Sequence, residues 1–168
     1  MYRKKTITKD LIRNALFVLL DENGNDVNNV KIVDLVKKAG VSRASFYRHY
    51  KSTNDVLMDA VDLPINEVVN ALNANHTSNW KTVIEIFRKN EFYLKKINEN
   101  GHLYLILERF NKQFSNDNYH MIAWGGLVYN IFATWINNGM KESNEEILKI
   151  IEETNLKIAK DIRKTSYI

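Results

Sequence analysis

The sequence predicts an all-α protein with a small N-terminal head and a larger helical body. Proline occurs once and glycine six times in 168 residues, so residues that break helices are scarce. Apolar residues recur every three or four positions along most of the chain, which is the spacing of one helix face. About nine helices are expected, three in a head of residues 1–52 and the rest in a helical bundle of residues 53–168.

The charge is unevenly divided between these two parts. Residues 1–52 hold 11 Lys/Arg and 5 Asp/Glu, a net charge of +6, whereas residues 53–168 hold 13 and 15, a net charge of −2. A basic head on a slightly acidic body is typical of a polyanion-binding domain joined to a second domain. A solvated basic surface without a partner would have the same composition.

Composition also excludes several classes of protein. Cysteine is absent, so the chain has no disulfides and no thiolate metal ligands. The sequence contains no run of about 18 apolar residues, the length that a membrane-spanning helix requires. No apolar signal segment follows the basic start MYRKKTITKD. A cytoplasmic location is therefore expected, with no membrane partner.

The first two helices follow from their apolar stripes. Thr8 is the expected N-cap of the first, and Asn23-Gly24-Asn25 ends it. Its stripe comprises Leu11, Ile12, Ala15, Leu16, Leu19 and Leu20. Asn28 or Asn29 is expected to cap the second, whose stripe comprises Ile32, Leu35, Val36 and Ala39. Residues 1–6 form a basic arm, either a phosphate-contacting or a disordered one.

The stretch GVSRASFYRHY, residues 40–50, predicts a turn followed by a third helix. Gly40 can adopt the positive φ that ends a helix, and Ser42 is a favourable N-cap. Phe46 and Tyr50 lie four residues apart and share the inward face. The outward face then carries two guanidinium groups, a phenol and no carboxylate, which suits DNA. Its residues are Arg43, Ala44, Tyr47 and Arg48.

The segment DLVKKAGVSRASFYRHYK, residues 34–51, resembles the DNA-binding signature of the TetR family of bacterial transcriptional regulators. The resemblance lies in Ala-Gly-Val-Ser, Phe-Tyr-Arg-His-Tyr and the Lys51-Ser52 exit, and an ordinary helical hairpin with a basic surface is the alternative. It implies a homeodomain-like trihelical helix-turn-helix head in a ligand-responsive homodimeric repressor. Its target would be a palindromic double-stranded operator with half-site centres about 34–36 Å apart, or a multiple of that distance.

The resemblance also implies specific DNA contacts. Phosphates are expected at Ser42, His49 and Lys51. Base edges are expected at Arg43, Ala44, Ser45 and Tyr47, and Arg48 suits either role.

The body begins at Ser52, which forms a near capping box with Asp55. Pro64 either kinks one long helix or starts a new one. A polar loop is expected at residues 73–79, and turns at residues 100–101, 115–118 and 138–139. The remaining helices are expected over residues 80–90, 91–99, 103–114, 119–137 and 145–160.

The helix over residues 119–137 is apolar almost all round, so it must be buried on two sides. A second subunit is the natural cover for one side; an intramolecular core is the alternative. The segment WINNGMKES, residues 135–143, resembles the linker between the last two helices of TetR-like regulators, which pair across a two-fold axis as a four-helix bundle. The expected interface comprises Trp124, Gly125, Gly126, Val128, Phe132, Trp135 and Ile151.

The resemblance further implies a small-molecule effector of unidentified structure. Aromatic side chains suit an apolar pocket in the body, with Glu108 or Asn130 as polar groups, although core packing explains such aromatics as well. The expected pocket residues are Tyr93, Tyr104, Glu108, Phe110, Tyr129 and Phe132.

No catalytic constellation is evident, so an enzyme, a metal site and a cofactor are not expected. The four histidines lack metal-ligand spacing, and the chain has no glycine-rich phosphate loop and no nucleophile elbow. Two other classes compete with the regulator. One is a helical interaction module or co-activator that does not itself read DNA sequence; the other is a small helical enzyme, which needs paired titratable groups in its cavity.

Overall fold

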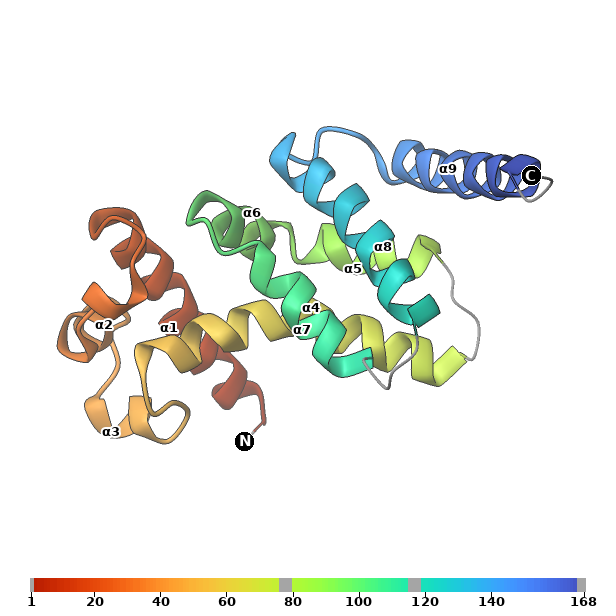
Figure 1. Ribbon diagram of the computed structural model, residues 1–168. Coiled ribbons are helices and arrows are strands. Elements are labelled where there is room, and N and C mark those ends of the chain that lie inside the picture. Colours follow the sequence, from red (N-terminus) through yellow and green to blue (C-terminus); the bar gives the residue numbers. More distant parts are fainter. Residues whose placement is uncertain (1, 76–79, 115–118, 166–168) are drawn as a thin grey trace.

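The computed structural model describes residues 2–75, 80–114 and 119–165, which form nine α-helices, one 3₁₀-helix and no strand (Figure 1). The all-α expectation is confirmed. None of the helices in these ranges combines the length and the apolar character that a membrane crossing requires. The elements are α1 (Tyr2–Glu22), η1 (Val27–Asn29), α2 (Ile32–Lys38), α3 (Arg43–Tyr47), α4 (Thr53–Asn75), α5 (Trp80–Lys89), α6 (Glu91–Glu99), α7 (Tyr104–Phe114), α8 (Tyr119–Asn137) and α9 (Asn144–Thr165).

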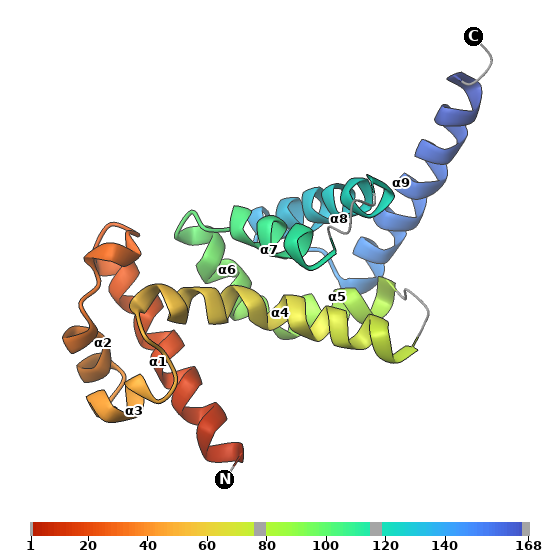
Figure 2. The ribbon, with the colours of Figure 1, turned by 60° about the horizontal axis from the view of Figure 1, so that its bottom comes forward.

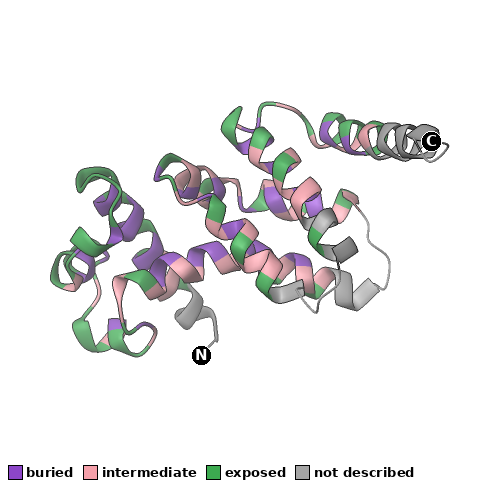
Figure 3. Cartoon of the chain, in the orientation of Figure 1, coloured by how far each residue is buried: buried purple, intermediate pink, exposed green. Residues whose placement is uncertain are grey.

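Helices α1, α2 and α3 form the head at one end of the molecule (Figure 1). Their inward faces meet in a small core in which Leu16, Leu20, Leu35 and Phe46 are fully buried. Helix α1 also packs against α4, so the head core continues into the body (Figure 3). Such a small core gains stability by sharing apolar surface with its neighbour.

Two expected helix starts in the head are wrong. Helix α1 begins at Tyr2 rather than after Thr8, since Arg and Lys are good helix formers and extend it toward the N-terminus. The chain before α2 forms η1, capped by the Asp26 carboxylate through the Asn28 amide, and the N-cap of α2 is Lys31 rather than Asn28 or Asn29.

The expected end of α1 is confirmed. Gly24 and Asn25 have φ values of 70° and 65°, and the Asn25 amide donates to the Leu20 carbonyl at 2.9 Å. Glycine and asparagine adopt this left-handed conformation more readily than other residues, so the dipeptide turns the chain toward α2.

Helix α4 joins head and body without interruption. At its start the Ser52 amide donates to the Asp55 carboxylate at 3.2 Å and the Asp55 amide donates to the Ser52 hydroxyl at 3.1 Å, which confirms the capping box. Pro64 lies inside the helix and starts no new one. The helix continues to Asn75, beyond the loop start expected at Asn73, and residues 76–79 lie outside the described residues, as do 115–118.

The body packs the later helices around the C-terminal part of α4. Helix α7 lies between α4 and α8, and α5 contacts both α4 and α9. The core of the body includes Ile84, Leu94, Ile97, Phe132 and Trp135, all nearly inaccessible to solvent. Helix α9 extends to Thr165, past the expected end at Lys160, and leads away from the body opposite the head (Figure 2).

Candidate DNA-binding surface and ligand cavity

A glycine turn sets the angle between α2 and α3. Gly40 has a φ of 66°, the left-handed conformation that the sequence predicts there. Its amide donates to the Lys37 carbonyl at 3.2 Å, and the Val41 amide donates to the Val36 carbonyl at 3.0 Å. This pair of bonds closes the end of α2 and directs the chain into α3.

Ser42 caps α3 as expected. Its hydroxyl oxygen accepts a hydrogen bond from the Ser45 amide at 3.1 Å, and its backbone is extended. Helix α3 itself has five residues and ends at Tyr47, while the Tyr50 amide still donates to the Phe46 carbonyl at 3.0 Å. The turn that follows keeps Tyr50 on the same side as Phe46.

Phe46 and Tyr50 anchor the inward face of α3. Phe46 is fully buried, Tyr50 is 4% exposed, and their ring centroids are 5.8 Å apart. The inward packing that the four-residue spacing predicts is therefore present.

The opposite face of α3 is open to solvent. Arg43, Ala44, Tyr47 and Arg48 are exposed, with 58% of Tyr47 accessible. Ser42 and Lys51 are also exposed, whereas Ser45 and His49 are half-buried beside them (Figure 3). Of the eight expected DNA-contacting residues, six are therefore exposed and two are half-buried.

No carboxylate lies in the sequence between Asp34 and Asp55, so the outward face of α3 is cationic. The Asp55 carboxylate accepts hydrogen bonds from the Lys51 and Ser52 amides, and the Lys51 bond is the main cause that lowers its pKa. The Asp55 carboxylate therefore caps the start of α4. A surface with guanidinium groups, an exposed phenol and no competing anion is suited to the DNA backbone and base edges.

A buried polar cluster fixes the end of the α3 segment. The Tyr50 hydroxyl donates to Asp59 of α4 at 2.8 Å, and Lys9 of α1 binds the same carboxylate at 2.6 Å. Arg13 of α1, which is 4% exposed, also pairs with Asp59. Burial raises the pKa of Asp59, but the hydrogen bonds from Lys9 and Tyr50 and the Arg13 charge outweigh it and lower the pKa.

The same cluster continues into the body. Arg13 lies over the ring of Tyr93 of α6, with the guanidinium carbon 5.3 Å from the ring centroid, and also pairs with Asp10. The Tyr93 hydroxyl donates to Asp10 at 3.3 Å. Polar side chains thus connect α6 to α1, and through Asp59 to the segment that presents Tyr47.

Sequence reasoning missed Lys9, Arg13 and Asp59. The available signal was a charged residue inside an apolar stripe, since Arg13 follows Ile12 and precedes Ala15 and Leu16. A charged residue at such a position requires a partner, because an unpaired buried charge is unstable. The partner Asp59 is 46 residues away and has no signature of its own.

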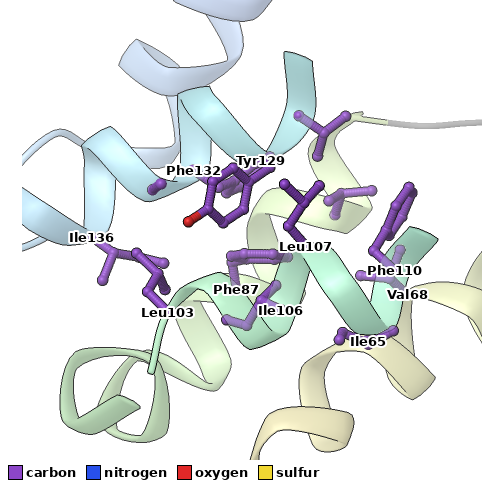
Figure 4. Close-up of a pocket in the computed structure, with 13 residues that line it drawn as sticks. Ile65, Val68, Phe87, Leu103, Ile106, Leu107, Phe110, Tyr129, Phe132 and Ile136 are labelled. Atoms are coloured by element: carbon purple, nitrogen blue, oxygen red, sulfur yellow. The ribbon is translucent and has the colours of Figure 1, made fainter. Parts of the chain in front are cut away.

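The body contains an apolar cavity between α4, α5, α7 and α8 (Figure 4). Its volume is about 40 Å³. Tyr129 brings the one hydroxyl group among the lining side chains, and the rest of the lining is hydrocarbon. The lining residues are Ile65, Val68, Val83, Phe87, Leu103, Ile106, Leu107, Phe110, Val128, Tyr129, Phe132, Ala133 and Ile136.

Three of the expected pocket residues, Phe110, Tyr129 and Phe132, line this cavity. The other three lie elsewhere. Tyr93 packs on α1, Tyr104 is 57% exposed, and Glu108 is exposed on α7. Asn130 is also exposed and donates to the Gly126 carbonyl at 2.8 Å.

The expected interface residues fall into three groups. Val128, Phe132, Trp135 and Ile151 are buried within one chain, at 7%, 2%, 1% and 0% exposure. Gly126 is half-exposed, and a Cβ atom added there would have no neighbour within 4 Å. The surroundings of Trp124 and Gly125 lie outside the described residues. Apolar surface on these helices is instead open at Ile122 and Ile150, which are 41% and 43% exposed.

Within the described part of the chain, no group of three or more His, Asp or Glu side chains is arranged to hold a metal ion. His49 is half-buried, with its ring centroid 6.3 Å from that of Tyr50.

Comparison with known proteins finds a family match in the head. Residues 19–60 match the family described as bacterial regulatory proteins, tetR family. The match spans the end of α1, the helix-turn-helix and the start of α4, and includes Asp59. No curated protein matches the chain.

Proposed function

We propose that this chain, a regulatory protein of the tetR family by its residues 19–60, is a ligand-responsive homodimeric repressor. It acts in the bacterial cytoplasm and binds a near-palindromic operator. The family is one of DNA-binding transcription regulators rather than enzymes. The observation that carries the proposal is the exposed Arg43–Arg48 face, held by a fully buried Phe46 and by Tyr50 on Asp59.

Each head presents α3 to one major groove. Arg43, Ala44, Ser45 and Tyr47 meet base edges, where a guanidinium group pairs well with guanine and apolar groups contact the thymine methyl. Ser42, His49 and Lys51 bind phosphates and fix the position of the helix, and Arg48 serves either role.

Two heads are joined through α8 and α9. The half-exposed Ile131 and the exposed Ile150 lie on a groove between these helices, and the open space at Gly126 allows a second backbone to approach. A two-fold dimer requires equivalent half-sites, which is why the operator is near-palindromic.

The effector is a neutral, mostly hydrocarbon molecule. The hydrocarbon lining and the single Tyr129 hydroxyl suit such a ligand, whereas the exposed Glu108 gives no support for a cationic one. A volume of about 40 Å³ is far below the roughly 300 Å³ of a typical ligand site, so binding widens the cavity.

Widening displaces the wall formed by Ile65 and Val68 of α4. Because α4 continues directly into the head, this displacement changes the separation of the two heads. Ligand then favours a dimer with the wrong spacing and releases DNA by population shift.

The test is selection of bound fragments from genomic DNA at one stated salt concentration, since DNA affinity depends steeply on salt. A shared near-palindrome among the fragments supports the proposal. Binding that ignores sequence would overturn it and favour the interaction module or co-activator.

A further inference from the structure

Arg88 of α5 contacts the end of α8, the turn that follows it and the start of α9. Its Nη1 donates to the Met140 carbonyl at 2.8 Å and its Nη2 to the Glu142 carbonyl at 2.6 Å. Its Nε donates to the Asn144 side chain, at the first residue of α9, at 3.2 Å. The guanidinium group also lies over the Trp135 ring of α8, 4.6 Å from the centroid.

The segment that Arg88 binds is the turn between α8 and α9. Gly139 and Met140 have positive φ values of 78° and 55°, and the Met140 amide donates to the Trp135 carbonyl at 2.8 Å. The Trp135 indole N–H donates to the same Glu142 carbonyl that Arg88 binds, at 3.2 Å. The turn thus has a defined shape, and Arg88 and Trp135 support it from the body side.

This turn shapes the outer groove between α8 and α9. The groove has a volume of about 300 Å³ and includes Trp135 and Glu142, two of the groups that meet at Arg88. It is lined by Asn130, Ile131, Thr134, Trp135, Asn138, Glu142, Ile147 and Ile150. Moving α9 relative to α8 would change the shape of this surface without changing its composition.

We infer that Arg88 is the positioning residue of the dimer interface. It fixes the first turn of α9 relative to the end of α8, so that the groove matches the same groove of a second copy. The inference rests on the homodimer proposed above. It depends on the planar fork of arginine, which donates to several carbonyl oxygens at fixed angles and stacks on an aromatic ring; lysine offers a single ammonium group.

The experiment compares Arg88→Met and Arg88→Lys with Arg109→Met in the full-length protein, by sedimentation equilibrium. Arg109 is a matched control, because its side chain is 28% exposed against 30% for Arg88 and it binds Asp62 across α7 and α4 through two hydrogen bonds. Both Arg88 variants should raise the dimer dissociation constant by about tenfold or more, because α9 is no longer held in the position at which the two grooves match. Arg109→Met should leave it within about threefold of the wild-type value.

Helix content, and the thermal midpoint measured at a concentration where wild-type protein and variant are both monomeric, separate positioning from general destabilisation. Arg88→Lys should keep the wild-type circular dichroism spectrum and monomer midpoint while its dimer weakens, whereas a purely structural role would move the monomer midpoint and leave association intact. Equal effects of Arg88→Met and Arg109→Met on association, or no effect of either Arg88 variant, would overturn the inference. A wild-type protein that is monomeric at all concentrations would instead refute the proposed homodimer.

Discussion

At the residue scale, two neighbours in the chain, Phe46 and Tyr47, occupy opposite environments. Phe46 is fully buried and Tyr47 is 58% exposed, with their rings in an edge-on contact at 5.4 Å. The helical period of the sequence predicts this division, since Phe46 and Tyr50 define the inward face. An exposed aromatic ring on a cationic surface is available for contact with a base edge or a thymine methyl group.

Replacing Tyr47 with alanine should lower affinity for the selected operator by roughly tenfold to hundredfold, the range expected for one base contact. Helix content and oligomeric mass should not change, because Tyr47 is 58% exposed and touches the core only through the edge of the Phe46 ring. Fluorescence anisotropy with labelled operator measures the effect. Tyr104→Ala is the control, since Tyr104 is equally exposed, at 57%, on α7 of the body. Equal affinities for the two variants would contradict the assignment of α3.

Asp59→Asn should destabilise the fold by about 2 kcal/mol, because the nearly buried Arg13 loses one of its two carboxylate partners and keeps only Asp10. The pKa of Asp59 is lower in the folded state than its ordinary value of 3.8, so its stabilising effect is complete above about pH 4. That effect is lost as the pH falls through the lowered pKa. Urea unfolding as a function of pH should therefore show the two proteins converging in acid. A loss below about 1 kcal/mol at neutral pH would show that the cluster does not hold Arg13 as described.

At the element scale, the sequence predicts helices well and their ends less well. The ends of α1 and α2 follow from Gly24 and Gly40, because a positive φ restricts the residue choice. The start of α1 lies before the predicted one, because a favourable cap at Thr8 does not prevent good helix formers from extending the helix. Pro64 left two alternatives open, and packing against α1, α5 and α7 favours one continuous α4.

Pro64→Ala should raise the free energy of unfolding by about 1 kcal/mol. Proline inside a helix costs about 3 kcal/mol relative to alanine, since it removes a backbone hydrogen bond and strains the preceding turn. Removing two buried methylene groups offsets about 1.6 kcal/mol of that gain. Chemical denaturation measures the difference, and a variant less stable than the wild-type protein would contradict the account of α4.

The predicted site residues also divide into those that the local sequence predicts and those that depend on contacts between distant helices. The proposed DNA-contacting residues lie in one short segment, where the local helical period predicts which side chains are exposed and which are buried. The cavity depends on contacts between distant helices, and for this reason Phe110, Tyr129 and Phe132 line it whereas Tyr93 and Glu108 do not. Tyr93 faces α1 because its ring and hydroxyl group contact Arg13 and Asp10 there. The spacing of apolar residues along α6 does not predict this contact.

At the scale of the whole molecule, a basic head and an acidic body are joined by one rod-like helix, α4 (Figure 1). Ile65 and Val68, which line the cavity, lie on this helix after Pro64, and Asp59, which binds side chains of the head, lies before it. The proposed dimer surface lies on α8, which runs beside α7, and on α9, which leads away from the body opposite the head (Figure 2). In the proposed mechanism, a ligand in the body changes the geometry of two heads through this helix, without touching DNA.

Gly126→Glu should produce monomers with weak operator affinity, because the open space beside Gly126 is proposed to receive a second subunit. A carboxylate buried there without a partner opposes association. Asn70→Glu on α4 is the control for added negative charge at an exposed position. Light scattering measures the mass, and a stable dimer of Gly126→Glu would move the interface away from this part of α8.

The central claim is that two copies of the α3 face read two related half-sites. The most direct measurement compares the wild-type affinity for the selected operator with that for the same operator carrying one scrambled half-site, at one salt concentration, with stoichiometry determined in parallel. Two chains should bind per intact operator, and scrambling either half-site should lower the affinity by at least about a hundredfold. This loss is smaller than the usual ratio of specific to non-specific DNA affinity. A single chain per operator, or an affinity that ignores the scrambled half-site, would contradict the claim.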